Sequence, residues 1–303
     1  MSRLEFINET YPTRRTKVEK DAFAAYVTEN YSARVEVTSD GKNKNLVIGD
    51  PARASVVCTA HYDTPAASLF PNLMIPRNPV LFFAYQFLMV GVLLAVSLAG
   101  GALAGALTGG DQRAFLLGYL ILYYLLYFLM FRAFENKHNA NDNTSGVATV
   151  LSLAERGFGE EVAFILFDNE EGGKKGSKAY FKDHSSYMQN KFLVNFDCVG
   201  NGEELVFIAR KDAEGREELA RLKAAFRSSD AYTAHFFPER GSQCNSDHKN
   251  FPCGVGCMAC RRTRRGLLYT PYIHTGRDTV ASADNVRYIT DRMCEFLEAE
   301  GKE

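Results

Sequence analysis

Tryptophan is absent from this chain of 303 residues, and so is an excess of charge of either sign. Lysine and arginine together number 35 and aspartate and glutamate 36, which gives a net charge of -1. Because no basic excess is available to neutralise phosphates, the composition argues against nucleic-acid binding. Residues 1–20 also lack the apolar stretch of a secretory signal, so we expect no export by that route.

Cysteine is present, but in an arrangement that does not suit a disulfide framework. The seven cysteines are odd in number and spread along the chain, which favours free thiols in a reducing compartment. Cys253, Cys257 and Cys260 have a spacing that resembles a metal site. No fourth ligand lies nearby in the sequence, so we expect core packing or redox-labile thiols at these positions instead.

Charge is almost missing from residues 78–131, where only Asp111 and Arg113 are charged. Residues 79–107 form an apolar run of 29 residues, long enough as a helix to cross roughly 30 Å of hydrocarbon. Residues 114–131 contain no charge and reach the lower length limit for a second span. The sequence therefore predicts a transmembrane helical hairpin over residues 78–131.

The composition of this segment leaves an alternative open, because buried core helices or an apolar oligomer interface would share it. The small residues of Gly101-Ala-Leu-Ala-Gly105 would let two helix backbones approach closely. Arg77, Arg132 and Lys137 flank the outer ends of the segment, whereas Arg113 alone marks the central turn. This bias predicts an integral membrane protein with cytoplasmic termini.

Without residues 78–131, 249 residues remain, and we expect residues 1–77 and 132–303 to form one discontinuous domain. Short apolar runs alternate with helical patterns along these residues, which predicts an α/β three-layer sandwich with a mixed, largely parallel central sheet. The predicted strands are 34–38, 44–48, 55–59, 162–167, 192–196, 205–208 and 255–260, and the predicted helices are 21–30, 146–156, 176–183, 213–228 and 285–300.

Acidic residues and histidines follow the predicted strands, at the edge of the sheet where ligands bind in open α/β folds. His61 ends the first long apolar run, Glu170 and Glu171 follow the next, and Asp197 follows the third. A single carboxylate at such a place is usually a helix cap or a solvated loop residue. A series of them would repel unless cations were bound, and carboxylate with imidazole suits zinc, so we predict a metal site.

The ordered series of motifs resembles the co-catalytic di-zinc aminopeptidases of the bacterial leucyl aminopeptidase type. The resemblance runs from about residue 54 to residue 290, interrupted by the hairpin, and implies a zinc-exopeptidase fold. The motifs that carry it are His61-x-Asp63, Asp142-Asn-x-Ser-Gly146, Asp168-x-Glu170-Glu171, Asp197, Ser246-Asp247-His248 and His274-x3-Asp278-Thr279.

The resemblance implies two zinc ions bridged by Asp142. His61 and Asp197 would complete one coordination shell, and Glu171 and His274 the other. A water shared by the two ions would then attack the peptide bond, with Glu170 as general base and acid.

Two further expectations concern residues beside the ligands. Asp63 lies two residues after His61, on the same side if the strand continues, so we count it as catalytic with Glu170 and expect it to accept the ring N–H of His61 that is not used for metal, which would fix the tautomer. The loop of Ser246, Asp247 and His248 resembles the family's substrate-pocket loop, and it is either a substrate-binding loop or an ordinary turn. The family also carries a non-proline cis peptide at the step that corresponds to Asp142-Asn143.

Eighty residues separate His61 from Asp142, and the predicted hairpin lies among them. We therefore expect the mouth of the site near a membrane surface, and membrane-associated or membrane-derived peptides as substrates. The prediction is a membrane-anchored zinc exopeptidase, specifically an aminopeptidase, with a cytoplasmic catalytic domain. Two alternatives stay open: a glutaminyl-cyclase-like single-zinc acyltransferase, disfavoured by the complete ligand set and the absence of tryptophan, and an inactive receptor, disfavoured by Glu170.

Overall fold

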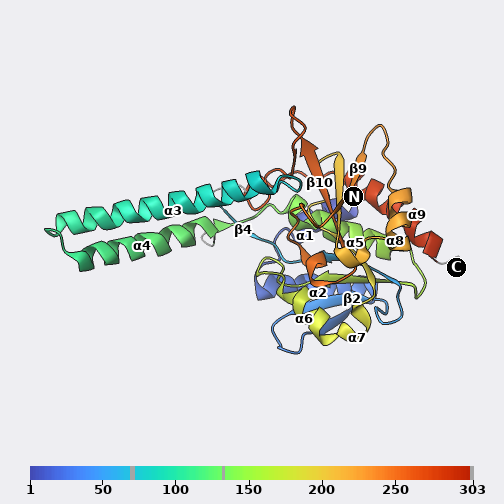
Figure 1. The fold of residues 1–303 in the computed structure, drawn as a ribbon. Coiled ribbons are helices and arrows are strands. Elements are labelled where there is room, and N and C mark those ends of the chain that lie inside the picture. Colours follow the sequence, from blue (N-terminus) through green and yellow to red (C-terminus); the bar gives the residue numbers. More distant parts are fainter. Residues whose placement is uncertain (69–71, 132–133, 301–303) are drawn as a thin grey trace.

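The computed structural model describes residues 1–68, 72–131 and 134–300. Figure 1 shows an α/β sandwich that contains both ends of the chain, and a long helical hairpin that projects from one side of it. The hairpin leaves and re-enters the sandwich within the predicted segment. The sandwich itself is assembled from sequence on both sides of this insertion.

A mixed sheet forms the middle layer, in the order β1-β2-β6-β3-β7-β10-β8-β9, with β11 paired to β10. The four central strands β6, β3, β7 and β10 run parallel to one another, and antiparallel pairs lie toward both edges. The strands are β1 (Arg34–Val37), β2 (Lys44–Ile48), β3 (Val56–His61), β6 (Val162–Phe167), β7 (Phe192–Phe196), β8 (Glu204–Ala209), β9 (Thr233–Pro238), β10 (Gly254–Arg262) and β11 (Leu268–Tyr269).

Helices cover both faces of the sheet, which explains why the central strands are continuous apolar runs rather than alternating ones. Every residue of β3, β6 and β7 is buried. One face packs against α1 (Arg3–Thr10), α2 (Lys17–Tyr31), α5 (Gly146–Ala154), α8 (Glu217–Ala225) and α9 (Ala283–Glu300), and the other packs against α6 (Lys175–Asp183) and α7 (Ser185–Met188). The predicted three-layer α/β class is thus confirmed.

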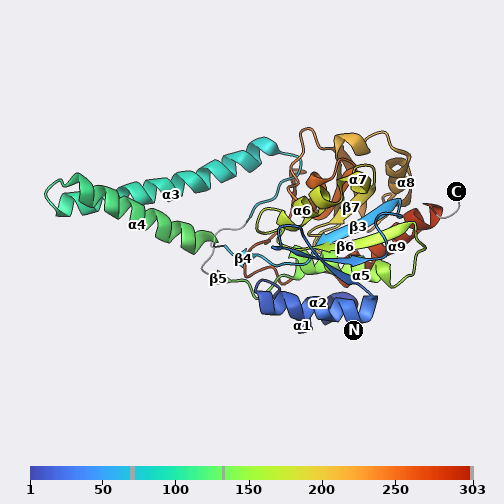
Figure 2. The ribbon, with the colours of Figure 1, turned by 90° about the horizontal axis from the view of Figure 1, so that it is seen from below.

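The hairpin consists of α3 (Pro79–Leu107) and α4 (Gln112–Phe131), two helices long and apolar enough to cross a membrane. Only 17% and 6% of their most apolar windows are buried, so the alternative of a pair of buried core helices is wrong. Small residues bring the helices together near the tip: a Cβ at Gly101 would lie 2.8 Å from the carbonyl oxygen of Phe115, and one at Gly118 would lie 2.7 Å from the Cβ of Ala104. Figure 2 shows the helices close at the tip and apart where they reach the sandwich.

The base of the hairpin is joined by a two-stranded sheet, β4 (Ala66–Ala67) with β5 (Phe134–Glu135).

Some elements differ from the predictions. Helix α1 and strand β9 were not predicted, and α8 begins at Glu217 rather than at residue 213. Gly215 has φ +80°, in the left-handed region, and therefore ends the helical conformation between a short 3-10 turn at Lys211–Ala213 and the start of α8.

Candidate metal centre

Strand register brings the first ligands together at one edge of the sheet. His61 is the last residue of β3 and pairs with Phe167 of the parallel strand β6, so residues 168–171 continue beside it. On the other side Thr59 pairs with Asn195 of β7, and Asp197 therefore follows at the level of His61. Parallel strands of matched register thus deliver three ligand-bearing segments to one place.

The loop that carries Asp142 is fixed by hydrogen bonds from the side chain of Asn143. The Asp142-Asn143 peptide is cis, as the resemblance implies. The Asn143 amide donates to the Phe196 carbonyl at 2.9 Å, and its oxygen accepts from the backbone N–H of Gly146 at 3.1 Å and of Cys198 at 3.2 Å. Gly146 is needed because a Cβ there would lie 2.3 Å from the Phe196 carbonyl oxygen. The loop is therefore clamped to the end of β7.

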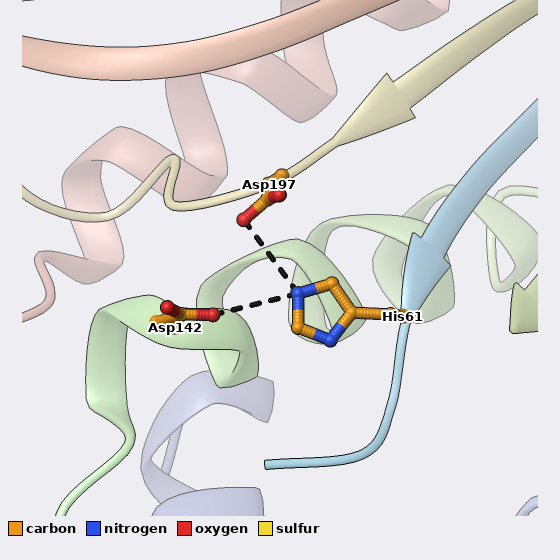
Figure 3. A group of neighbouring side chains, drawn as sticks. All are labelled: His61, Asp142 and Asp197. Carbon is orange, nitrogen blue, oxygen red and sulfur yellow. Dashed lines mark ion pairs between the residues drawn. The ribbon is translucent and has the colours of Figure 1, made fainter. Parts of the chain in front are cut away.

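The first ligand group joins His61, Asp142 and Asp197, whose side chains converge in Figure 3. The His61 Nε2 atom lies 3.4 Å from Asp142 Oδ1 and 3.6 Å from Asp197 Oδ1. His61 and Asp142 are buried, whereas Asp197 is partly exposed. One imidazole nitrogen and two carboxylates so arranged match the first predicted zinc shell.

The second group joins Asp142, Glu171 and His274. The His274 Nε2 atom lies 3.1 Å from Asp142 Oδ2 and 3.5 Å from Glu171 Oε2. Asp142 thus presents one carboxylate oxygen to each group, which is the arrangement expected of a ligand shared by two ions. The third group found within the described ranges, His61 with Glu170 and Glu171, overlaps these two.

The types of donor atom in these groups, and one buried oxygen without a hydrogen bond, favour binding of divalent cations. The Glu171 Oε1 atom is buried and has no hydrogen-bond partner among the residues that the structure describes, a costly condition that a bound cation would relieve. Nitrogen and carboxylate donors in groups of three are the ligands that zinc commonly takes. The residues present therefore fit zinc on their chemistry alone.

Electrostatic shifts in this cluster follow from burial and from close pairing. Burial alone would raise the pKa of Asp142, but hydrogen bonds with His274 and His61 hold that pKa well below its usual range. Burial opposes the imidazolium of His274, yet Glu171 and Asp142 raise its pKa to about 10. Burial raises the pKa of Glu171 to about 8. These directions follow from the close approach of carboxylates and imidazoles in a buried cluster.

Glu170 and Asp63 lie beside the two groups. Burial raises the pKa of Glu170 well above its ordinary value, and its backbone N–H donates to Asp63 Oδ1 at 2.9 Å. The second Asp63 oxygen accepts from the N–H of Glu171 at 3.2 Å. His61 Nδ1 lies 3.0 Å from the Asp63 backbone carbonyl and 3.6 Å from its carboxylate. The backbone of Asp63 is thus the nearer partner of the ring, and its carboxylate holds the Glu170-Glu171 turn.

The segment Ser246-Asp247-His248 lies in the interior, with each of its side chains at most 1% exposed. The Ser246 hydroxyl accepts from Asn195, and Asp247 accepts from Ser177. The ring of His248 packs against Gly256 and has no hydrogen-bond partner within the described ranges. Burial lowers its pKa to about 3. These three residues are therefore packed inside the protein, and the neighbouring Cys244 and Asn245 line the cavity that contains the ligands instead.

Two buried residues without a predicted role support the site. Arg14 is fully buried and donates to the Tyr62 carbonyl at 2.6 Å and to the Thr144 hydroxyl at 3.1 Å, which ties the N-terminal segment to both ligand loops. Asp278 accepts from the backbone N–H of Asn141 and Asp142 at 3.0 and 2.9 Å. Asp278 appears in the motif series, whereas nothing in the local sequence marks Arg14.

The three spaced cysteines form no metal site in the described part of the chain. Cys257 packs in the larger core on one face of the sheet, and Cys260 packs in a cluster on the other face. Residues three apart on a strand point to opposite sides, so these thiols cannot converge. All three are free and buried, as core packing predicts.

Comparison with known proteins gives a family and a fold. A family model described as peptidase family M28 matches residues 131–297, which contain Asp142, Glu170, Glu171, Asp197 and His274 but not His61. A search of curated proteins finds no match.

Solved structures resemble the chain over nearly its whole length. The LapA aminopeptidase of Legionella pneumophila is 15% identical with a TM-score of 0.58, and the alignment covers 99% of this chain and 68% of LapA. A Zn-dependent exopeptidase of Parabacteroides distasonis is 14% identical with a TM-score of 0.58, and the alignment covers 98% of this chain and 96% of that protein. The glutaminyl cyclase of Porphyromonas gingivalis is 13% identical with a TM-score of 0.58, and the alignment covers 99% of this chain and 97% of the cyclase. At these identities the likeness establishes the zinc-exopeptidase type of fold.

Proposed function

The chain belongs to peptidase family M28, and from this premise we propose that it is a membrane-anchored, zinc-dependent aminopeptidase. One observation carries the proposal: two groups of ligand atoms share Asp142, and Glu170 lies beside them. A structural or binding protein has no need of this arrangement of buried charge. A hydrolase that handles a water molecule and an amide does need it.

We assign His61, Asp142 and Asp197 to one zinc ion, and Asp142, Glu171 and His274 to a second. Bound zinc would act as a Lewis acid that polarises the scissile carbonyl and acidifies the attacking water. The Asp63 carboxylate accepts hydrogen bonds from the backbone N–H groups of Glu170 and Glu171, which would hold this turn so that both glutamate side chains keep their orientation.

Glu170 is the proposed general base and acid. Its carboxylate belongs to the same cluster as His61 and Glu171, and it lines the cavity that contains both ligand groups. Burial raises its pKa well above its ordinary value, which favours a carboxylate able to take a proton from water and return it to the leaving amine. Hydrolysis of this kind needs no covalent bond between enzyme and substrate.

Membrane anchoring is proposed from the hairpin. Both helices are long enough to span the hydrocarbon region, and their large apolar side chains are exposed over most of their length. An even number of spans places the two chain segments that flank the hairpin on one side of the membrane. The flanking basic residues Arg77 and Lys137 favour the cytoplasmic side.

Glutaminyl cyclase activity is the second candidate, because cyclases of this fold resemble the chain as closely as the peptidases do. The complete second group around Glu171 and His274 supports a two-metal hydrolase instead. Products distinguish the two: a cyclase releases ammonia from N-terminal glutamine, whereas a peptidase releases a free amino acid.

The direct test is a screen of aminoacyl and N-blocked peptides with the full-length chain in detergent, with zinc added and with a chelator. We expect hydrolysis of free N-terminal substrates only, abolished by the chelator and restored by zinc. Cleavage of blocked peptides at an equal rate would contradict aminopeptidase activity, and ammonia release from glutaminyl peptides alone would establish the cyclase.

Replacing Glu170 with Gln tests the assigned base separately from the metal. The variant should lose at least about a hundredfold in kcat, because the amide cannot accept the proton from water. Zinc content should stay at the wild-type level, since Glu170 is not assigned as a ligand. Wild-type turnover by Glu170→Gln would exclude the assigned mechanism.

A further inference from the structure

Two cavities meet at the metal centre, and both have Glu171 and His274 in their walls. The narrower cavity, about 240 Å³, also contains Glu170 and Asp142. The wider one, about 540 Å³, shares these two ligands and is lined further by Asp63 and its neighbours Thr64 and Pro65. A bound peptide that places its scissile bond at these ligands would therefore extend into both.

Each cavity takes one wall from the helical hairpin. Phe82, in the first turn of α3, lines the narrower cavity, and Tyr127, near the end of α4, lines the wider one. Figure 2 shows the two helices reaching the sandwich at separate points, so each can contribute to a different cavity. The hairpin therefore provides more than two apolar helices, because one side chain from each helix lines a cavity at the site.

The two cavities differ in chemistry. The apolar walls of the narrower cavity come from Met74, Phe82, Met258 and Ile273. The wider cavity is lined by charged side chains, Lys20, Lys175 and Asp63 among them, with Tyr127. Beside the ligands and beside Glu170 and Lys174, the smaller cavity offers these four apolar residues to one substrate side chain. A solvated peptide chain matches the larger, charged cavity.

The base of α3 is held firmly against the sandwich, which gives Phe82 a defined position. The Arg77 guanidinium lies 4.4 Å from the centre of the Phe237 ring and donates to the Ser242 hydroxyl at 3.0 Å. Asn78 caps the helix by accepting from the N–H of Leu81 at 2.9 Å, and its carbonyl accepts from the N–H of Phe82 at 3.0 Å.

The segment before α3 is also tied to the ligands themselves. The backbone N–H of Ser68 donates to the carbonyl of His274 at 2.7 Å, and Met74 pairs with Thr270 across a β-bridge. A displacement of the hairpin base would therefore move both a cavity wall and the backbone of a ligand. This coupling favours a built site over a chance contact.

We propose that the hairpin is part of the substrate-binding site, with Phe82 against the side chain of the N-terminal residue and Tyr127 against the peptide beyond the cleaved bond. The proposal rests on the peptidase function proposed above. The substrate class that fits is a peptide with a large apolar N-terminal residue. Because α3 and α4 carry apolar surface up to these two positions, the substrate would bind at the surface of the bilayer.

The first test compares Phe82→Ala with Phe87→Ala, a matched change on the same helix at a side chain 74% exposed. Full-length protein in detergent is assayed on leucyl, phenylalanyl and alanyl anilides. Phe82→Ala should lower kcat/KM about tenfold for the leucyl and phenylalanyl substrates and hardly change it for the alanyl one. Phe82→Trp should leave less room in the cavity and lower kcat/KM for the phenylalanyl substrate more than for the alanyl one. Phe87→Ala should match wild type.

The outcomes separate the two proposals. Equal losses on all three anilides, or no change in selectivity with either Phe82 variant, would overturn the assignment of Phe82 while leaving the peptidase function intact. Absence of hydrolysis by zinc-loaded wild type would overturn the function itself, and the assignment with it. Zinc content is measured in each variant, and an unchanged value shows that the metal centre is preserved.

The second test concerns Tyr127, compared with Tyr124, whose side chain is 64% exposed and lines neither cavity. Tyr127→Ala should raise KM about fivefold for a leucyl tetrapeptide and leave leucine amide unaffected, because only the tetrapeptide reaches beyond the cleaved bond. Tyr124→Ala should change neither. Equal effects on both substrates would exclude the assigned role of Tyr127.

Discussion

Asp142 is the residue on which both halves of the metal centre depend. Its Oδ1 lies toward His61 and its Oδ2 toward His274, and its backbone is held by Asp278 on one side and by the clamp of Asn143 on the other. Burial makes an uncompensated charge here expensive. Protons on His61 and His274 can balance this charge, and zinc would displace these protons when it binds the two histidines.

This displacement predicts a pH dependence of zinc binding. His274 with a pKa of about 10 and Glu171 with a pKa of about 8 both carry protons near neutral pH, whereas zinc binds their unprotonated forms. Zinc binding should therefore release protons and become tighter as pH rises from about 6 to about 9. Calorimetry in buffers of different ionisation enthalpy measures the release, and binding without proton release would contradict these pKa directions.

The same shifts predict how zinc-free protein responds to pH. The pKa of His274 is raised from 6.5, so its contribution to the free energy of unfolding is complete below 6.5 and lost as pH rises through about 10. The rise in melting temperature on adding zinc should therefore be larger at about pH 8.5 than at about pH 6. An equal rise at both values would contradict this linkage.

Arg14 should matter to stability although it touches no ligand directly. Replacing it with Met would leave the carbonyls of Tyr11 and Tyr62 without their buried donor, at a cost of about 2–4 kcal/mol in the free energy of unfolding. Arg14→Lys should recover part of the loss, because one ammonium cannot reproduce the forked contacts. Denaturant unfolding checks this, with exposed Arg265→Met as the matched control, and equal stability of the two Met variants would refute it.

At the scale of elements, the two helices of the hairpin pack closely against each other near the tip. Gly118 lies against Ala104, and a Cβ already reaches 2.7 Å from the Ala104 side chain. Gly118→Leu should force the helices apart and lower the melting temperature of the protein, because overpacking costs about 1–3 kcal/mol in the free energy of unfolding. Gly91→Leu is the control, because a Cβ there meets no atom within 4 Å. Equal melting temperatures for the two variants would argue against this packing.

The elements that sequence predicted well are those whose pattern is local. The fully buried strands β3, β6 and β7 appear as continuous apolar runs, and α3 matches its predicted range of residues 79–107. Strand β9 was missed because it is partly exposed at the edge of the sheet and lacks such a run. A local pattern reports burial on both faces and gives little signal at an edge.

The ligands could be predicted because each follows a strand end or a recognisable motif. Arg14 could not, because its partners lie 3, 48 and 130 residues away in the chain and only the fold brings them together. The burial of His248 beneath β10 is equally non-local, since Gly256 makes room for its ring. Motif order thus gave the assigned ligands, while the residues that hold the loops came from the tertiary structure.

At the scale of the whole molecule, the insertion would set the enzyme on a membrane with its cleft beside the base of the hairpin. The topology proposed here predicts that the tip and the sandwich lie on opposite sides. In intact cells a membrane-impermeant maleimide should label Gly110→Cys at the tip, whereas Ser39→Cys in the sandwich should react only after permeabilisation. The reverse pattern would invert the topology, and the parent chain gives the background from its own cysteines.

Metal content per chain tests the central claim most directly. After zinc loading and removal of free metal, mass spectrometric metal analysis should find about two zinc ions in the wild type, about one in His274→Ala, and fewer still in Asp142→Ala, which removes the shared ligand. A wild type that holds a single zinc ion, unchanged by His274→Ala, would contradict the paired site.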